Sequence, residues 1–157
     1  MKIILLSVGK TDQDSIAQLI EEYRKRTNFY ISFDTEIVPD VKNTKNLSER
    51  ELKTKESVFL LKALHPSDYV VLLDDKGRQF SSVEFAQFIE KKTHSVPKRL
   101  VFVVGGPYGF SDEMYARANE KVSLSRMTFT HQMVRLVFAE QLYRAMTIVR
   151  GEAYHHE

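Results

Sequence analysis

The last third of the chain decides the fold, and it contains VVGGPYGF at residues 103–110, SLSRMTFTHQM at residues 123–133 and GEAYHH at residues 151–156. In the first stretch an apolar strand breaks into a glycine turn, and in the second a short strand breaks into a Ser/Thr loop. The third stretch is a short aromatic and histidine tail after a long apolar helix. Glycines at a strand end let a ligand approach the main chain closely. The pattern predicts a pocket lined by loops, with the polar tail laid across it.

Working outward from these stretches, strand-like and helix-like segments alternate along the whole chain. Apolar runs rich in β-branched residues predict strands at residues 2–8, 31–38, 68–73, 99–104 and 121–124. Helical periodicity predicts helices at residues 15–27, 49–64, 82–92, 111–119 and 131–150, with capping boxes at Ser48 and Ser81 and a cap at His131. This alternation predicts an α/β fold with a mostly parallel sheet of five to six strands, flanked by helices. Ligands of such sheets bind beyond the carboxyl ends of the strands.

Size and composition describe a single domain that spans residues 1–157 and is 43% hydrophobic and 28% charged. The absence of cysteine excludes disulfides and thiolate sites, and the five histidines have no spacing that fixes a metal, so we expect none. No apolar run approaches the ~18 residues that span a bilayer. The N-terminus is too short for a signal peptide, so we expect a cytoplasmic protein.

The net charge of +2 does not by itself indicate a nucleic-acid partner. Residues 91–157 nevertheless carry ten Lys and Arg against six Asp and Glu, so the basic excess lies with the loops described above. An anionic partner would require such a distribution. An ordinary solvated surface explains the charge equally well.

The long helix predicted at residues 131–150 is apolar over more than half of its circumference. A helix of this kind is buried on more than one side. In so small a chain, the second buried side predicts a subunit interface of a homodimer, with Val137 and Phe138 in its seam. Glu140, Arg144 and Thr147 share the remaining polar face, where a solvated Glu140–Arg144 ion pair is the simplest interpretation.

Several of these motifs together resemble the methyltransferases of the SPOUT superfamily. They are Gly-Gly-Pro-x-Gly at a strand end, Ser-Leu-Ser-x-Met-Thr-Phe-x-His-Gln-Met before a long helix, Glu-Gln-Leu-Tyr-Arg-Ala within that helix, and a terminal Tyr-His. Within the superfamily, the chain is similar to the enzymes that methylate N3 of a pseudouridine in 23S rRNA. The similarity covers the whole chain and is most specific in the last third. One departure is Thr130, where many relatives have proline.

The resemblance implies a C-terminal trefoil knot, which sequence periodicity could not have indicated because knots are rare. It also implies S-adenosylmethionine as the cofactor, held by loops after three strands. The cofactor-binding residues that it implies are Leu73, Gly105, Gly106, Ser125, Arg126, Met127, Thr128, Phe129 and Thr130.

The implied substrate is a pseudouridine in the helix 69 loop of 23S rRNA, within the large subunit or the assembled ribosome. The residues implied for catalysis on the RNA side are Arg144, Tyr154 and His155. Arg144 would stabilise the developing anion, and the other two would shape the base pocket. Two alternatives remain open at this point. One is a nucleotide-binding regulatory module with the same loops, and the other is an RNA-binding protein without catalytic activity.

Overall fold

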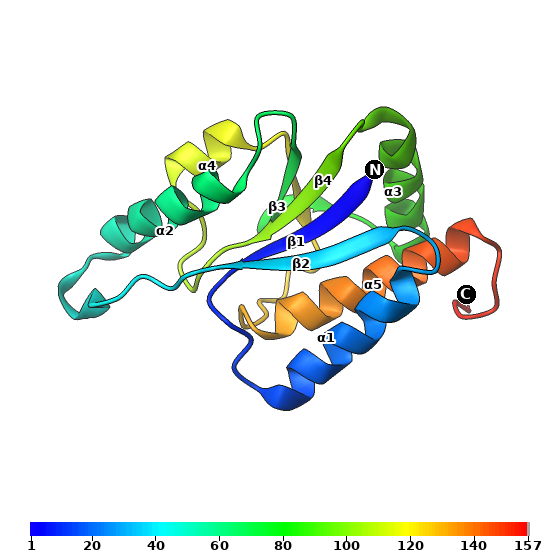
Figure 1. The fold of residues 1–157 in the computed structure, drawn as a ribbon, viewed down its shortest axis with the longest axis horizontal. Coiled ribbons are helices and arrows are strands. Elements are labelled where there is room, and N and C mark those ends of the chain that lie inside the picture. The colour runs from blue at the N-terminus through cyan, green and yellow to red at the C-terminus, as the bar shows by residue number, and fades with distance from the viewer. Residues whose placement is uncertain (157) are drawn as a thin grey trace.

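The computed structural model describes residues 1–156, which form a parallel sheet between two layers of helices (Figure 1). The strands are β1 (Lys2–Val8), β2 (Ser32–Val38), β3 (Tyr69–Gln79), β4 (Arg99–Val104) and β5 (Glu120–Ser123). The helices are α1 (Asp14–Thr27), the 3-10 helix η1 (Thr44–Asn46), α2 (Glu49–Ala63), α3 (Ser82–Ser95), α4 (Asp112–Arg117) and α5 (Met133–Val149). None of these helices is long and apolar enough to cross a membrane.

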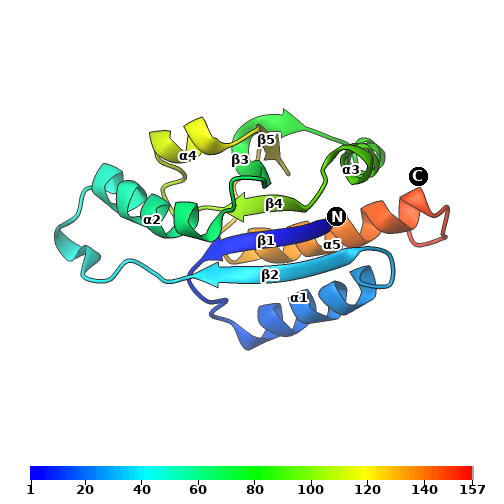
Figure 2. The same cartoon turned by 45° about the horizontal axis from the view of Figure 1, so that its top comes forward.

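The sheet has the strand order β2-β1-β4-β3-β5, and every neighbouring pair is parallel. Strands β1 and β4 lie in the middle and are apolar and buried along most of their length, as strands covered on both faces must be. Helices α1, α3 and α5 pack on one face of the sheet, and α2 and α4 pack on the other (Figures 1 and 2). The predicted α/β fold with a parallel sheet is therefore confirmed, with five strands. The trefoil knot stays a prediction.

Strand β3 runs beyond the predicted end at residue 73 because its second half re-enters the sheet after an irregularity. Leu73 and Arg78 both pair with Val122 of β5, so residues 74–77 leave the regular ladder. A Cβ atom on Gly77 would lie 2.7 Å from the main chain of β5, which explains the glycine. The polar sequence DDKGRQ at residues 74–79 shows no alternation, and for that reason periodicity does not reveal this part of the strand.

Helix α5 is buried mainly within its own chain. The side chain of Phe138 is fully buried, and its ring centroid lies 4.7 Å from that of Phe102 and 6.2 Å from that of Phe33. The prediction that Phe138 lies in a subunit seam is therefore wrong. The helix is apolar on several sides because it lies between α1, α3 and the sheet. Val137 is only partly buried.

The ends of α5 differ in how well the sequence predicts them. The helix begins at Met133, whose N–H donates to Oγ1 of Thr130 at 3.1 Å, so the prediction that His131 caps it is wrong. Gly151 follows the helix with φ of +69°, the left-handed conformation that glycine adopts most easily. The predicted helix end is confirmed.

Candidate functional site

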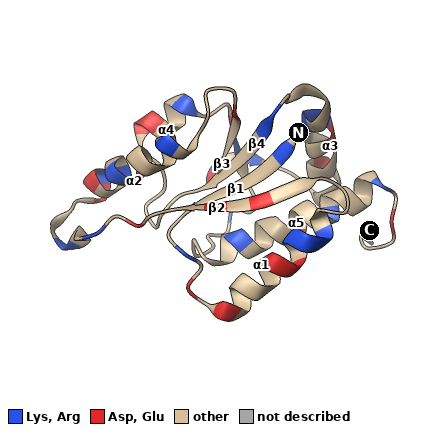
Figure 3. Ribbon diagram, in the orientation of Figure 1, with Lys and Arg blue, Asp and Glu red and all other residues tan. Residues whose placement is uncertain are grey.

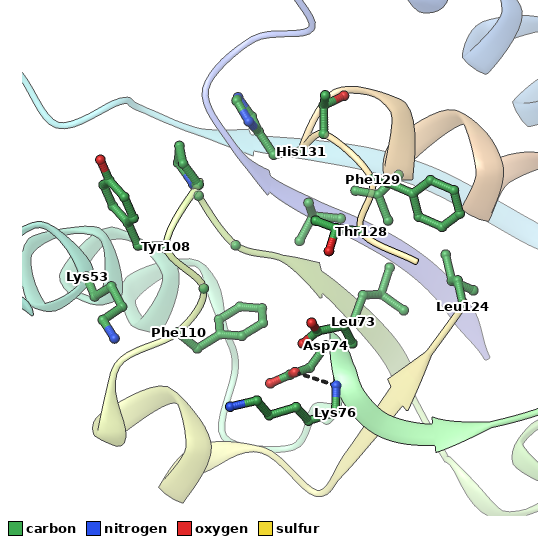
Figure 4. A pocket seen from close by; sticks show the side chains of 18 of the residues that line it. Lys53, Leu73, Asp74, Lys76, Tyr108, Phe110, Leu124, Thr128, Phe129 and His131 are labelled. Carbon is green, nitrogen blue, oxygen red and sulfur yellow. Dashed lines mark hydrogen bonds between the residues drawn. The ribbon is translucent and has the colours of Figure 1, made fainter. Parts of the chain in front are cut away.

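A cavity of about 810 Å³ opens at the carboxyl edge of the sheet, between residues 73–76 at the irregularity of β3 and the loops that follow β4 and β5 (Figure 4). Of the nine residues implied as cofactor-binding, all except Arg126 line this cavity. His131 also lines it, together with Tyr108 and Phe110. Three separate segments of sequence therefore meet in one place, as parallel strand ends predict.

The loop after β4 presents main chain to the cavity. Gly106, Pro107, Tyr108 and Gly109 form a tight turn in which the N–H of Gly109 donates to the carbonyl oxygen of Gly106 at 3.2 Å. Gly109 has φ of +84°, a conformation that favours glycine. Gly105 and Gly106 both line the cavity, so a ligand there can approach their main-chain groups.

The loop after β5 is shaped by hydroxyl groups. Oγ of Ser123 donates to the carbonyl oxygen of Ser125 at 2.9 Å, and the N–H of Met127 donates to Oγ of Ser125 at 2.9 Å. Arg126 lies at the tip of this small turn and is exposed, which is why its side chain does not line the cavity. The hydroxyl of Thr130 accepts from the N–H of Met133 at the start of α5, a hydrogen bond that a proline at this position could not make.

Asp74 is a polar residue of the cavity wall that sequence reasoning missed. Its Oδ1 accepts from the N–H of Lys76 at 2.9 Å, and its Oδ2 accepts from the Tyr115 hydroxyl (Figure 4 shows the first bond). Burial alone would raise the pKa of Asp74, but these hydrogen bonds outweigh burial and lower it. The cavity therefore contains a carboxylate at neutral pH. Two acidic residues directly after a buried strand were the signal that could have identified it.

The structure brings together the three residues implied for catalysis. After Gly151 the tail folds back along α5, so Nη1 of Arg144 lies 3.2 Å from Nδ1 of His155. Cζ of Arg144 lies 4.8 Å from the centroid of the Tyr154 ring. Glu140 organises this cluster, because it accepts from Nη2 of Arg144 at 2.5 Å and from the Tyr154 hydroxyl at 3.1 Å. The Glu140–Arg144 pair is half-buried, and it connects the helix to the tail.

The same contacts fix the charge state of the cluster. The hydrogen bond to Glu140 raises the pKa of Arg144 above its ordinary value, although burial opposes this. Burial, followed by hydrogen bonding with Tyr23 and the charge of Glu140, raises the pKa of Tyr154. Arg144 is therefore a cation and Tyr154 a neutral hydroxyl at neutral pH.

The prediction that the tail lies across the cavity is wrong for a single chain. Val134 at the start of α5 lines the cavity, whereas Arg144 lies ten residues further along the helix, a distance of ~15 Å at 1.5 Å per residue. The tail folds back beside the C-terminal half of α5, so the carboxyl end of the described chain lies at the end of the helix away from the cavity (Figure 1). Among residues 1–156, no group of three or more His, Cys, Asp or Glu side chains is placed to hold a metal ion.

Comparison with known proteins shows the family to which this chain belongs. The family described as "Predicted SPOUT methyltransferase" matches residues 1–155. The "Ribosomal RNA large subunit methyltransferase H" of Parabacteroides distasonis is 59% identical over 157 residues, and the match covers all of both chains. The proteins of the same name from Phocaeicola vulgatus and Flavobacterium johnsoniae are 57% and 56% identical, again over the full length of each chain. The chain therefore belongs to the SPOUT methyltransferase family.

Proposed function

We propose that this protein transfers the methyl group of S-adenosylmethionine to N3 of a pseudouridine in the helix 69 loop of 23S rRNA. The observation that carries the proposal is the meeting of residues 73–76 of β3 with the loops after β4 and β5 around one cavity of about 810 Å³. The full-length relatives, which are named ribosomal RNA large subunit methyltransferases, support an RNA substrate. A ribosomal substrate would place the protein in the cytoplasm.

The residues of the cavity fit the cofactor. Leu73, Gly105, Gly106 and the loop at residues 125–130 offer main-chain donors and acceptors that adenine and the methionyl group can use. The carboxylate of Asp74 suits a hydroxyl or a positively charged group at the same wall. When bound, the cofactor supplies a methyl group that is already activated by its sulfonium, so the protein needs to supply orientation and exclusion of water.

We further infer that the active form is a homodimer with composite sites. Arg144 near the end of α5 and the tail residues Tyr154 and His155 lie too far from the cavity of their own chain to reach it, so a second copy would have to supply them. Apolar side chains near the cavity support this arrangement, because Met127 is 78% exposed and Met133 is 40% exposed. A twofold axis would cover both surfaces and create two equivalent sites.

The chemistry assigned to the cluster follows from its charge. A pseudouridine N3–H must lose its proton during transfer, and the guanidinium of Arg144 would stabilise the anion that develops. Glu140 fixes the orientation of that guanidinium. Tyr154 and His155 offer a ring for stacking and polar atoms for the edge of an extruded base, which is how unpaired RNA bases are usually recognised.

Both subunits would also contribute Lys and Arg side chains to the surface that contacts the RNA. In Figure 3 the Lys and Arg residues are spread over several helices and are interspersed with Asp and Glu. No continuous basic stripe is visible along one chain in this view. Binding to phosphates would therefore depend on the paired subunits and on the shape of the ribosomal surface.

Two measurements test the proposal in sequence. Calorimetry with S-adenosylmethionine should give saturable binding at one site per chain. Radiolabelled methyl groups should then transfer to ribosomes or large subunits, and nucleoside mass spectrometry should locate the label on N3 of pseudouridine. Binding without transfer to ribosomes, large subunits or free 23S rRNA would instead favour the regulatory module, and a label on a different base would overturn the assigned substrate.

A further inference from the structure

Glu56 of α2 is a buried carboxyl group that the proposed chemistry does not use. Its side chain points to the carboxyl edge of the sheet, and the residue is only 5% exposed. Its Oε1 is inaccessible to solvent and has no hydrogen-bond partner within residues 1–156. Such a group costs free energy to bury, so it calls for a specific explanation.

The carboxyl group of Glu56 lies directly against the glycine turn. A Cβ atom on Gly106 would lie 2.2 Å from Oε2 of Glu56 and 2.8 Å from its Cδ. Gly106 also lines the cavity, so this glycine lies between the cavity and the carboxyl group. Glu56 therefore occupies the space that a side chain at position 106 would need.

We propose that Glu56 is a positioning residue, which supports the turn at residues 105–109 from behind in the shape that receives the methyl donor. The inference rests on the proposed function, because it takes S-adenosylmethionine as the ligand of the cavity. This role of Glu56 gives a second reason for a glycine at position 106. The carboxyl group of Glu56 leaves no room for a side chain there, whether or not a ligand is bound. Glu56 touches the turn and does not line the cavity, so its effect on the ligand is indirect.

The protonation state of Glu56 makes this support sensitive to pH. Burial, and then the charge of Asp40 after β2, raises the pKa of Glu56 to about 7. Asp40 is the one charged residue on a neighbouring segment that contributes to this shift. Below that pH the carboxyl group is neutral, and packing it against the glycine costs less free energy than burying a carboxylate there. Above it the carboxylate requires N–H donors, and the main chain beside it is the turn itself.

The first test measures the affinity for S-adenosylmethionine by calorimetry on either side of the pKa of about 7. We expect the wild-type protein to bind several-fold more weakly at the higher pH, and Glu56→Gln to keep the stronger affinity at both. Glu56→Ala should bind roughly tenfold more weakly at both pH values. The exposed Glu51 of the same helix provides the control, and Glu51→Gln should behave as wild type. A wild-type pH profile that Glu56→Gln leaves unchanged would overturn the role of the carboxyl group.

The second test is a double-mutant cycle with Gly106→Ala. If Glu56 occupies the space beside position 106, Gly106→Ala should weaken S-adenosylmethionine binding strongly in the wild-type background and only slightly in the Glu56→Ala background. The fold-losses in affinity in the two backgrounds should differ by roughly tenfold. Equal losses in both backgrounds would show that only the ligand requires the glycine, and the proposal would fail.

A third measurement needs no cofactor and therefore separates this proposal from the proposed function. In the ligand-free protein, amide hydrogen exchange at residues 105–110 should be faster in Glu56→Ala than in the wild type or in Glu56→Gln. Unchanged protection in Glu56→Ala would contradict the support role even if cofactor binding were normal. If Glu56→Ala fails to fold, Glu56→Gln and its pH profile still decide the question.

Discussion

Arg144 lies between Glu140 and His155 and above the ring of Tyr154, so its function depends on partners in its own chain. The same holds for Asp74, which Tyr115 and a main-chain amide keep ionised at the cavity wall. At the residue scale, the charge state of each side chain follows from its hydrogen bonds and its burial. Two predictions concern single side chains.

Arg144→Ala should slow methylation of ribosomes about a hundredfold, because loss of a charged contact to a developing anion typically costs ~3 kcal/mol. S-adenosylmethionine affinity should change by only a few fold, since Arg144 does not line the cavity of its own chain. Single-turnover kinetics and calorimetry separate the two effects. Glu140→Gln should give a smaller loss, because the guanidinium remains but is less well oriented. A rate close to wild type for Arg144→Ala would remove this residue from the chemistry.

Glu56 should also make the free energy of unfolding depend on pH. Its pKa is about 7 in the folded protein and near the ordinary 4.5 when unfolded, so between these values the folded state binds more protons. Stability should therefore fall as pH rises from about 4.5 to 7, by on the order of 3 kcal/mol from this group. Urea unfolding of wild type and Glu56→Gln across this range isolates the contribution as a difference. Parallel curves for the two proteins would contradict the assignment.

Among the secondary-structure elements, two irregular segments supply polar groups to the proposed composite site: the break in β3 and the tail after α5. The break in β3 at residues 74–77 turns Asp74 toward the cavity, and it is possible because Gly77 lets β5 approach closely. The tail folds back on α5 through the aromatic contact of Tyr154 with Tyr143, whose ring centroids are 4.8 Å apart. The break in β3 brings the Asp74 carboxylate to the cavity wall, and the folded-back tail brings the Tyr154 hydroxyl to Glu140 of α5.

Gly77→Ala should destabilise the protein by roughly 1 to 3 kcal/mol, because its Cβ would lie 2.7 Å from main-chain atoms of Lys121 and Val122, and main chain cannot move aside cheaply. It should also weaken S-adenosylmethionine binding, since residues 73–76 of β3 and the loop after β5 both line the cavity. Urea unfolding and calorimetry measure the two effects. Lys76→Ala, a neighbouring exposed position, is the control for stability and should unfold like the wild type.

Deletion of residues 154–157 should nearly abolish methylation while leaving S-adenosylmethionine affinity within a few fold. The described part of the tail follows the last helix and packs on the surface of α5, so stability should change little. Methylation assays, calorimetry and thermal unfolding of the shortened protein test all three expectations. Normal methylation would show that the tail has no part in the reaction.

In the whole molecule, the cavity and the cluster at Arg144 lie at different ends of α5, so the proposed reaction would require a second copy of the chain. The exposed methionines beside the cavity are the surface that this copy would cover. Light scattering should therefore give the mass of a dimer at micromolar concentration.

A mixture of two inactive variants tests the composite site directly. Arg144→Ala leaves the cavity intact, and Gly105→Val damages it, because even a Cβ there would lie 3.1 Å from the carbonyl oxygen of Gly109. When the two chains are co-expressed, half of the dimers are mixed and each has one complete site, so roughly a quarter of wild-type activity should return. Failure to recover activity in mixed dimers that bind S-adenosylmethionine would show that each chain completes its own site.

Most of the strands and helices and the two loops after β4 and β5 could be predicted from the sequence, because they depend on local signals, but residues 74–79 of β3 could not. Apolar runs mark β1 and β4, Ser81 forms the predicted capping box, and the glycine turn marks the cavity. Eight of the nine residues implied by the resemblance line that cavity for the same reason: loops at the ends of parallel strands converge.

Only the tertiary structure decided which segments become partners. Periodicity showed that α5 is buried on several sides, but it could not show that Phe138 packs against Phe102 of its own chain. It could not place the tail at the far end of that helix, nor Glu56 against Gly106, since these residues are distant in sequence. A local pattern fixes whether a side chain is buried, whereas the identity of its neighbours depends on how the whole chain packs.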